Sequence, residues 1–94
     1  MNVKVIRMNT GEEVIVTLLN ETEDSIEIEN PLVGMPTQTG QIGFGPWAPL
    51  VKNDDSITLS KSYIVYLADA QVDVVEQYEK IFSPIETPSK KLIL

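Results

Sequence analysis

The side chains that could do chemistry in this chain are carboxylates, amines, phenols and hydroxyls, because its 94 residues include no histidine and no cysteine. Cysteine nucleophiles, histidine general bases and zinc sites built from either residue are therefore excluded. No group of acidic residues has the spacing of a metal-binding loop, and no glycine-rich phosphate loop precedes a helix. The sequence thus predicts a protein that is not an enzyme, with no catalytic residue, no metal and no cofactor.

Two acidic side chains on one expected strand, Glu27 and Glu29, could form a carboxylate pair for acid–base chemistry. They alternate with Ile26 and Ile28. Simple alternation of this kind is typical of a strand with one buried and one solvated face. We therefore interpret the two glutamates as a solvated outer face.

Composition and charge indicate one ordinary globular domain. The apolar fraction is 43% and the charged fraction 22%, as in average globular proteins. The net charge of −7 disfavours general nucleic-acid binding, because neutralisation of phosphates by cations supplies most of the non-specific affinity. No apolar run is long enough to span a membrane and residues 1–8 do not look like a signal peptide, so we expect a cytoplasmic protein without a membrane partner.

Short strands separated by turn signals fill residues 3–68, as in a small all-β barrel or sandwich. Gly11 can take a positive φ in the first turn. Two of the strands are apolar on both faces, which indicates that both faces are covered. These two are Glu12–Asn20 and Tyr63–Ala68, and the other expected strands are Val3–Met8, Ser25–Pro31 and Ile57–Ser60.

The run GQIGFGPWAPL, residues 40–50, is the most unusual segment of the chain. It has neither the glycine spacing of a phosphate loop nor the composition of a polyproline ligand. Glycines on both sides of Phe44 allow a sharply bent strand, and prolines on both sides of Trp47 favour an edge or a bulge. We expect Phe44 and Trp47 to anchor either the core or a subunit seam.

An amphipathic helix is predicted at Asp69–Phe82, where Val74, Val75, Tyr78, Ile81 and Phe82 form one apolar stripe. This stripe can pack on its own sheet or on a neighbouring subunit, and both interpretations stay open. Residues 84–94 are expected to form an extended tail. Its apolar end, Leu92–Leu94, is suited to docking on a neighbour.

The segment ITLSKSYIVYL, Ile57–Leu67, resembles the second signature motif of Sm and Sm-like (LSm) proteins: a short hydrophobic strand, a two-residue turn and a second hydrophobic strand. The first part of the chain is similar to the first signature, so the resemblance covers roughly residues 2–68. The tryptophan-containing strand and the C-terminal helix also resemble Sm-like proteins of marine cyanophages, a bacteriophage type.

The resemblance implies a mainly β fold: a small, strongly bent, five-stranded SH3-like (Sm-like) barrel at residues 1–68. A C-terminal α-helix at residues 69–83 and the tail at 84–94 would complete a single domain. It also implies a homo-oligomeric ring, expected to have five to seven copies, in which sheet edges of neighbouring copies pair. Such a ring would lie in the host cytoplasm if a phage encodes the protein. The expected interface residues are Tyr63, Val65, Tyr66, Trp47 and Phe44.

Single-stranded RNA is the usual ligand of this family, and the resemblance implies that Lys61, Ser60, Ser25 and Glu21 would contact it. The family turn normally carries Arg-Gly where this chain has Ser60-Lys61, and an ammonium neither stacks on a base nor forks as guanidinium does. The same residues also suit an ordinary polar hairpin turn. Two functions stay open: a ring-forming RNA-binding module, and a structural or protein-interaction oligomer that has lost RNA binding.

Overall fold

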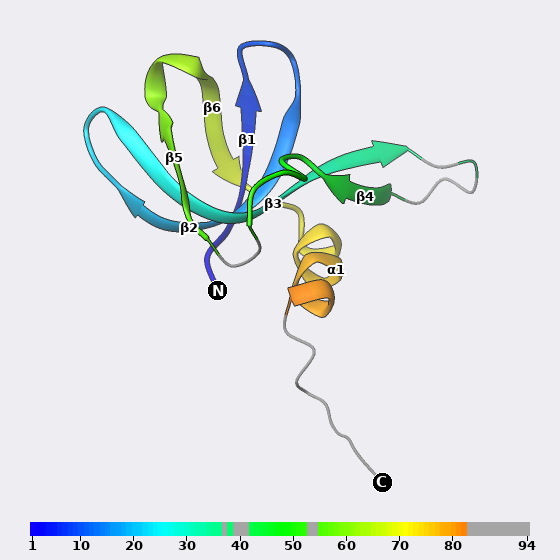
Figure 1. Cartoon of the computed structure of the whole chain (residues 1–94). Coiled ribbons are helices and arrows are strands. Elements are labelled where there is room, and N and C mark those ends of the chain that lie inside the picture. Colours follow the sequence, from blue (N-terminus) through cyan, green and yellow to red (C-terminus); the bar gives the residue numbers. More distant parts are fainter. Residues whose placement is uncertain (37, 39–41, 53–54, 83–94) are drawn as a thin grey trace, which may run out of the picture.

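The chain forms a six-stranded antiparallel sheet with one C-terminal helix (Figure 1), which confirms the prediction of a mainly β fold. The computed structural model describes residues 1–36, 38, 42–52 and 55–82. The predicted tail at residues 84–94 lies outside this range. The elements are β1 (Val3–Met8), β2 (Glu13–Glu21), β3 (Ser25–Pro36), β4 (Ile42–Pro46), β5 (Ile57–Ser60), a 3₁₀ turn (Lys61–Tyr63), β6 (Ile64–Asp69) and α1 (Val72–Phe82).

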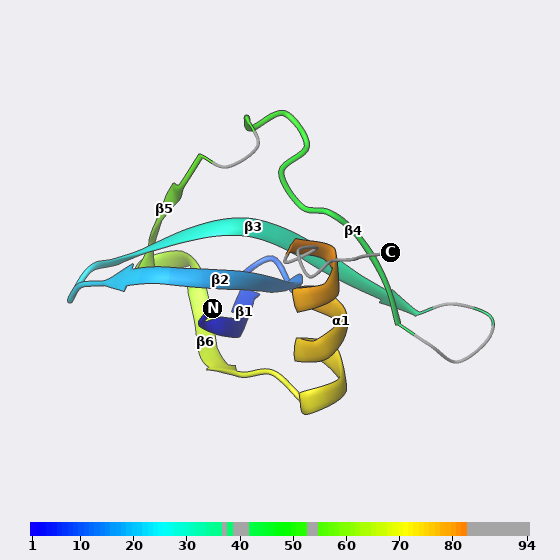
Figure 2. The same ribbon diagram turned by 90° about the horizontal axis from the view of Figure 1, so that it is seen from below.

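Strand β3 is the central strand of the sheet, because it pairs with three other strands. The order is β4-β3-β2-β1-β6, and β5 pairs with β3 off this path. The first part of β3 pairs with β5, from Ser25 to Ile28, and the second part pairs with β4, from Leu32 to Pro36. Figure 2 shows β3 running as one curved ribbon past β2, with β5 and β4 towards its two ends.

The strand count and the closure differ from the five-stranded barrel that was expected. The bent segment and the strand after it form separate strands, β4 and β5, so the sheet has six. Within the described residues the sheet is not closed, since β4 and β6 remain at opposite ends of the strand order.

A bulge lets β3 continue beyond Pro31, where the sequence predicted that it would end. Thr17 pairs with Glu29 and Ile15 pairs with Leu32, so β3 carries one more residue than β2 across this step. Asn30 has a φ of 55°, a left-handed conformation that asparagine tolerates better than most residues. The extra residue bends the strand and redirects it towards β4. Gly11 has the positive φ expected for the β1–β2 turn, 99°.

The core consists of two clusters on opposite faces of the sheet. One fills the concave side between the bent strands, and the other lies between the sheet and α1. Strand β2 contributes to both, because Val14 and Val16 belong to the first cluster and Ile15 to the second. Its two apolar faces are therefore covered within a single chain. Helix α1 packs on its own sheet through Val74 and Tyr78.

The hydroxyl of Tyr78 fixes the helix to the sheet. Tyr78 is fully buried, and its Oη lies 2.8 Å from Thr17 Oγ1 and donates to the carbonyl of Asn30 at 2.9 Å. Thr17 is itself buried. A buried hydroxyl is costly unless it is hydrogen-bonded, so this pair satisfies both groups. The bond joins α1 to β2 and to the bulge of β3.

We expect Tyr78→Phe to lower the free energy of unfolding by about 1–3 kcal/mol, because it leaves the buried Thr17 hydroxyl with one partner fewer. Urea denaturation followed by circular dichroism measures this change. Tyr63→Phe is the matched control, since Tyr63 is 57% exposed and its substitution should leave the midpoint unchanged. Equal effects of the two substitutions would contradict the assigned role of Tyr78.

Stability should also fall between about pH 10 and 12. Burial raises the pKa of Tyr78 to about 12 from an ordinary value of 10.0, so between these values the unfolded chain loses a proton that the folded chain keeps. The stabilisation is complete below the unfolded pKa and is lost as the pH rises through the folded one. Denaturation of the native chain and of Tyr78→Phe across this range tests it. The variant should lack this part of the pH dependence, and identical profiles would refute the assignment.

Candidate functional site

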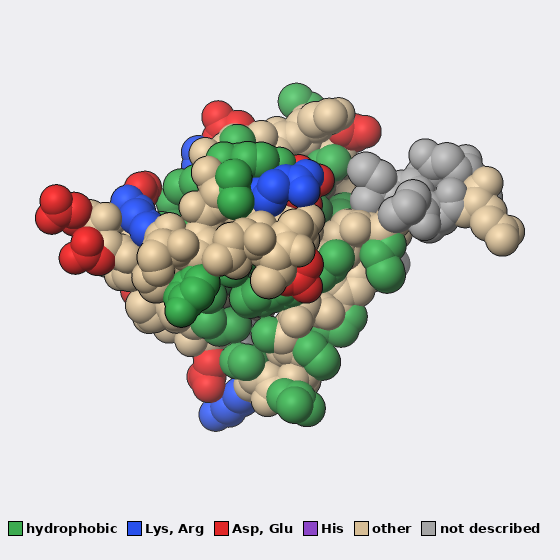
Figure 3. Space-filling view, turned by 90° about the horizontal axis from the view of Figure 1, so that it is seen from above, with side chains coloured by type: hydrophobic (Ala, Val, Ile, Leu, Met, Phe, Trp, Pro, Cys, Tyr) green, Lys and Arg blue, Asp and Glu red, His purple; other side chains and the backbone are tan. Residues whose placement is uncertain are grey.

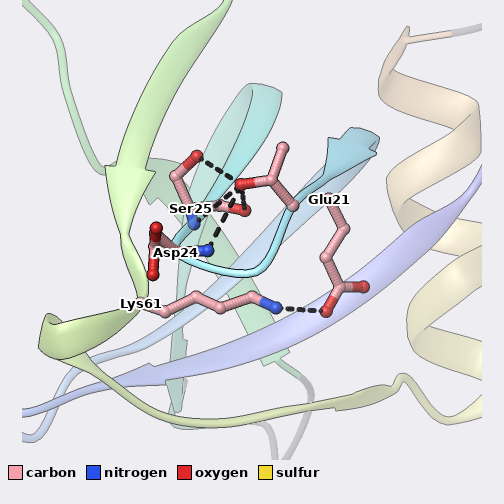
Figure 4. Close-up of polar contacts among 5 residues, drawn as sticks. Glu21, Asp24, Ser25 and Lys61 are labelled. Atoms are coloured by element: carbon pink, nitrogen blue, oxygen red, sulfur yellow. Dashed lines mark hydrogen bonds and ion pairs between the residues drawn. The ribbon is translucent and has the colours of Figure 1, made fainter.

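The four residues predicted to contact RNA come together where the β2–β3 turn meets the end of β5. Ser25 and Ser60 are directly paired between β3 and β5. Lys61 follows at once, and its Nζ lies 2.8 Å from Glu21 Oε2 at the end of β2. The Lys61 backbone N–H also donates to the Asp24 carbonyl at 2.8 Å. Figure 4 shows the lysine side chain lying beneath the turn and reaching across to Glu21.

The turn between β2 and β3 is held by one threonine hydroxyl. Thr22 Oγ1 accepts from the backbone N–H of Ser25 at 3.1 Å and lies 3.0 Å from Ser25 Oγ. It accepts more weakly from the N–H of Asp24 at 3.4 Å. The Thr22 backbone N–H donates to the Ser25 carbonyl at 2.8 Å, which closes the turn. Ser25 is thus engaged inside the turn through both its backbone and its hydroxyl (Figure 4).

Ser60 has a local structural role as well. Its hydroxyl oxygen accepts from the backbone N–H of Ser62 at 3.3 Å and lies 2.8 Å from Ser62 Oγ. Ser60 therefore caps the N-terminus of the 3₁₀ turn that reverses the chain into β6. This local role of Ser60 fits the interpretation of these residues as an ordinary polar hairpin turn, the alternative to an RNA contact.

Charge around Lys61 is predominantly negative. Its ammonium is paired with Glu21, and the same turn carries Glu23 and Asp24, both exposed. Figure 3 shows acidic side chains gathered at the end of the molecule on the left, where the β2–β3 turn lies. A phosphate approaching Lys61 would have to compete with Glu21 and would meet this negative field.

The five predicted interface residues divide into two groups. Tyr63, Val65 and Tyr66 lie on the surface and are 57%, 62% and 38% exposed. Trp47 and Phe44 are half-buried and pack against the two core clusters, Trp47 on the concave side and Phe44 beneath α1. The core alternative for these two aromatic residues is therefore confirmed, and their place at a subunit seam stays a prediction.

A cluster of Arg7, Glu13 and Tyr66 was not identified from the sequence. Arg7 lies next to Glu13 on β2 and to Tyr66 on β6 through the pairing of β1 with both strands. The Tyr66 hydroxyl donates to Glu13, while the Arg7 guanidinium lies 3.4 Å from Glu13 Oε2 and 5.7 Å from the centre of the Tyr66 ring. The hydrogen bond with Tyr66 is the main cause that raises the pKa of Arg7. The alternation within each strand does not indicate this cluster. It can be predicted only when the order of the strands in the sheet is known.

Within the described ranges, no three acidic side chains are grouped as they would be around a metal ion. No described helix is long and apolar enough to cross a membrane. Among known proteins, no family model and no curated sequence matches the chain.

Proposed function

We propose that the chain is a self-associating module of the Sm-like type, whose copies join at the edges of their sheets. The observation that carries this proposal is the apolar surface of β6. This strand pairs with β1 on one side, and within the described residues its other edge has no partner. Val65 and Tyr66 are exposed on it, and Tyr63 is exposed in the 3₁₀ turn just before it. An open, apolar edge strand is a template for pairing with another chain.

The strand order supports a head-to-tail arrangement of copies. The sheet ends in two different strands, β6 and β4, and β5 adds a further edge beside β3. Pairing β6 of one copy with a different strand of the next copy makes a heterologous contact, which generates a ring when the rotation closes. An SH3-like barrel and a ring of five to seven copies are part of the proposal, and the bend of β3 and the pairing of β6 with β1 support it.

The charge distribution favours a structural or protein-interaction role over general RNA binding. Lys4, Arg7 and Lys61 each pair with a carboxylate of the same chain. These cations therefore contribute little net positive field to attract phosphates. The net charge of −7 acts in the same direction.

RNA binding at the β2–β3 turn is the second candidate. It is favoured by one observation: the predicted contacts Lys61, Ser60, Ser25 and Glu21 lie together where the β2–β3 turn meets the end of β5. In a ring, symmetry would repeat this group of residues and its lysine once for each copy.

The assembly is tested with Val65→Lys, which places a charge on the open edge. We expect light scattering to show an oligomer for the native chain and a mass close to that of one chain for the variant, because edge lysines oppose strand pairing. Val72→Lys is the matched control, since Val72 is 75% exposed at the start of α1 and should not alter the mass. A native chain that is monomeric at every concentration would overturn the proposal.

RNA binding is tested with two variants of the same ion pair. Lys61→Ala should weaken binding of short uridine- or adenine-rich RNA severalfold and reduce the salt slope by about one. Glu21→Gln should tighten binding, because the amide no longer forms the ion pair with Lys61 and can still hydrogen-bond to RNA. Lys80→Ala on α1 serves as the control, and fluorescence anisotropy at several salt concentrations gives the affinities. Affinity that responds neither to salt nor to either variant would eliminate RNA contact at this turn.

A further inference from the structure

We propose that the groove between β6, the neighbouring sheet face and the start of α1 binds the basic and apolar segment Lys90–Leu94 of the same chain. The groove has a volume of about 500 Å³, within the range of about 300–1,000 Å³ that is typical of ligand pockets. Its walls are mostly apolar and carry two carboxylates. The lining residues that matter here are Val5, Ile15, Met35, Val74, Glu13 and Asp69.

The segment has the chemistry that this groove would recognise. Lys90 and Lys91 precede the apolar residues Leu92–Leu94, so two cations adjoin a short hydrophobic run. Apolar side chains gain by leaving water for an apolar wall, and the carboxylates at the rim attract the ammonium groups. Glu13 and Asp69 already pair with Arg7 and Lys4, but their side chains are 51% and 84% exposed. Each can therefore accept a second cation.

A second groove lies closer to the end of α1 and matches the segment less well. Its volume is about 230 Å³ and Phe82 forms part of its wall. Its lining includes a cation, Lys52, which would repel a segment with two lysines, whereas the described lining of the first groove includes no cation. The smaller volume of the second groove and the lysine in its wall therefore favour the first groove.

The chain is long enough for the segment to reach the first groove within one molecule. Gln71 and Val74, at the start of α1, line this groove. The helix has 11 residues, so its two ends are separated by about 16 Å along the axis. From Phe82 to Lys90 an extended chain spans up to about 26 Å. Attachment to the same chain also gives the segment a high effective concentration at the groove.

Disulfide trapping in the full chain tests this proposal, and the absence of native cysteines makes the readout clean. One variant combines Gln71→Cys with Ile93→Cys, which places one thiol at the first groove. The comparison variant combines Ala48→Cys with Ile93→Cys, which places it at the second groove. After correction for the reactivity of each thiol with glutathione, we expect the Gln71 pair to form an intramolecular disulfide at least about tenfold faster.

Two further changes separate specific docking from random encounter. In the Gln71→Cys/Ile93→Cys chain, Leu92→Ser with Leu94→Ser should slow trapping severalfold, and Lys90→Gln with Lys91→Gln should slow it and remove its salt dependence. Circular dichroism identifies any variant that fails to fold. Equal trapping rates at the two grooves, or no effect of either change, would overturn the proposal. Predominant disulfide-linked dimers would show that a second copy supplies the segment and would also overturn it.

Discussion

The buried hydroxyl of Tyr78 determines how the helix sits on the sheet, and the rest of the fold depends on that placement. β2 has apolar residues on both faces, and α1 covers one of them. Within that covered face Thr17 brings a hydroxyl into the core, and the phenol satisfies it while also donating to the carbonyl of Asn30. The Asn30 carbonyl is available because β3 bulges there. Helix docking, the two-sided core and the bend of β3 are therefore one coupled arrangement.

Short apolar runs separated by turn signals were enough to predict most strands, and β1 and β5 have the predicted bounds. The continuation of β3 was not predictable, because Pro31 lacks a backbone N–H and reads as the end of a strand. It continues because Asn30 adopts a left-handed conformation and forms a bulge. The apolar residues on both faces of β2 also indicated that both faces must be covered. This pattern could not tell a neighbouring copy from the chain's own helix, because both present the same apolar surface to the strand.

Proximity within the candidate site was predictable, whereas its electrostatics was not. The resemblance to the Sm-like motifs implied that Ser25, Ser60 and Lys61 lie near one another, and the pairing of Ser25 with Ser60 brings them together. The charge that Lys61 offers to a phosphate depends on Glu21, because the two side chains form an ion pair. The cluster around Arg7 required still more information, since it combines β2, β1 and β6. The motifs could indicate which strand ends meet, whereas the cluster around Arg7 requires the strand order β2-β1-β6.

The pairing of β1 with β6 has a consequence for biosynthesis. Val5 on β1 pairs with Ala68 on β6, so β1 leaves the ribosome before β6 and gains this partner only after the intervening strands have been made. Long-range strand pairing is slow compared with hairpin formation. Until β6 arrives, one edge of β1 is open to wrong partners on the same or another nascent chain. The charges of Lys4 and Arg7 on β1 would disfavour such pairing during this interval. The two residues that form surface ion pairs in the finished fold would thus also protect the growing chain from wrong strand pairing.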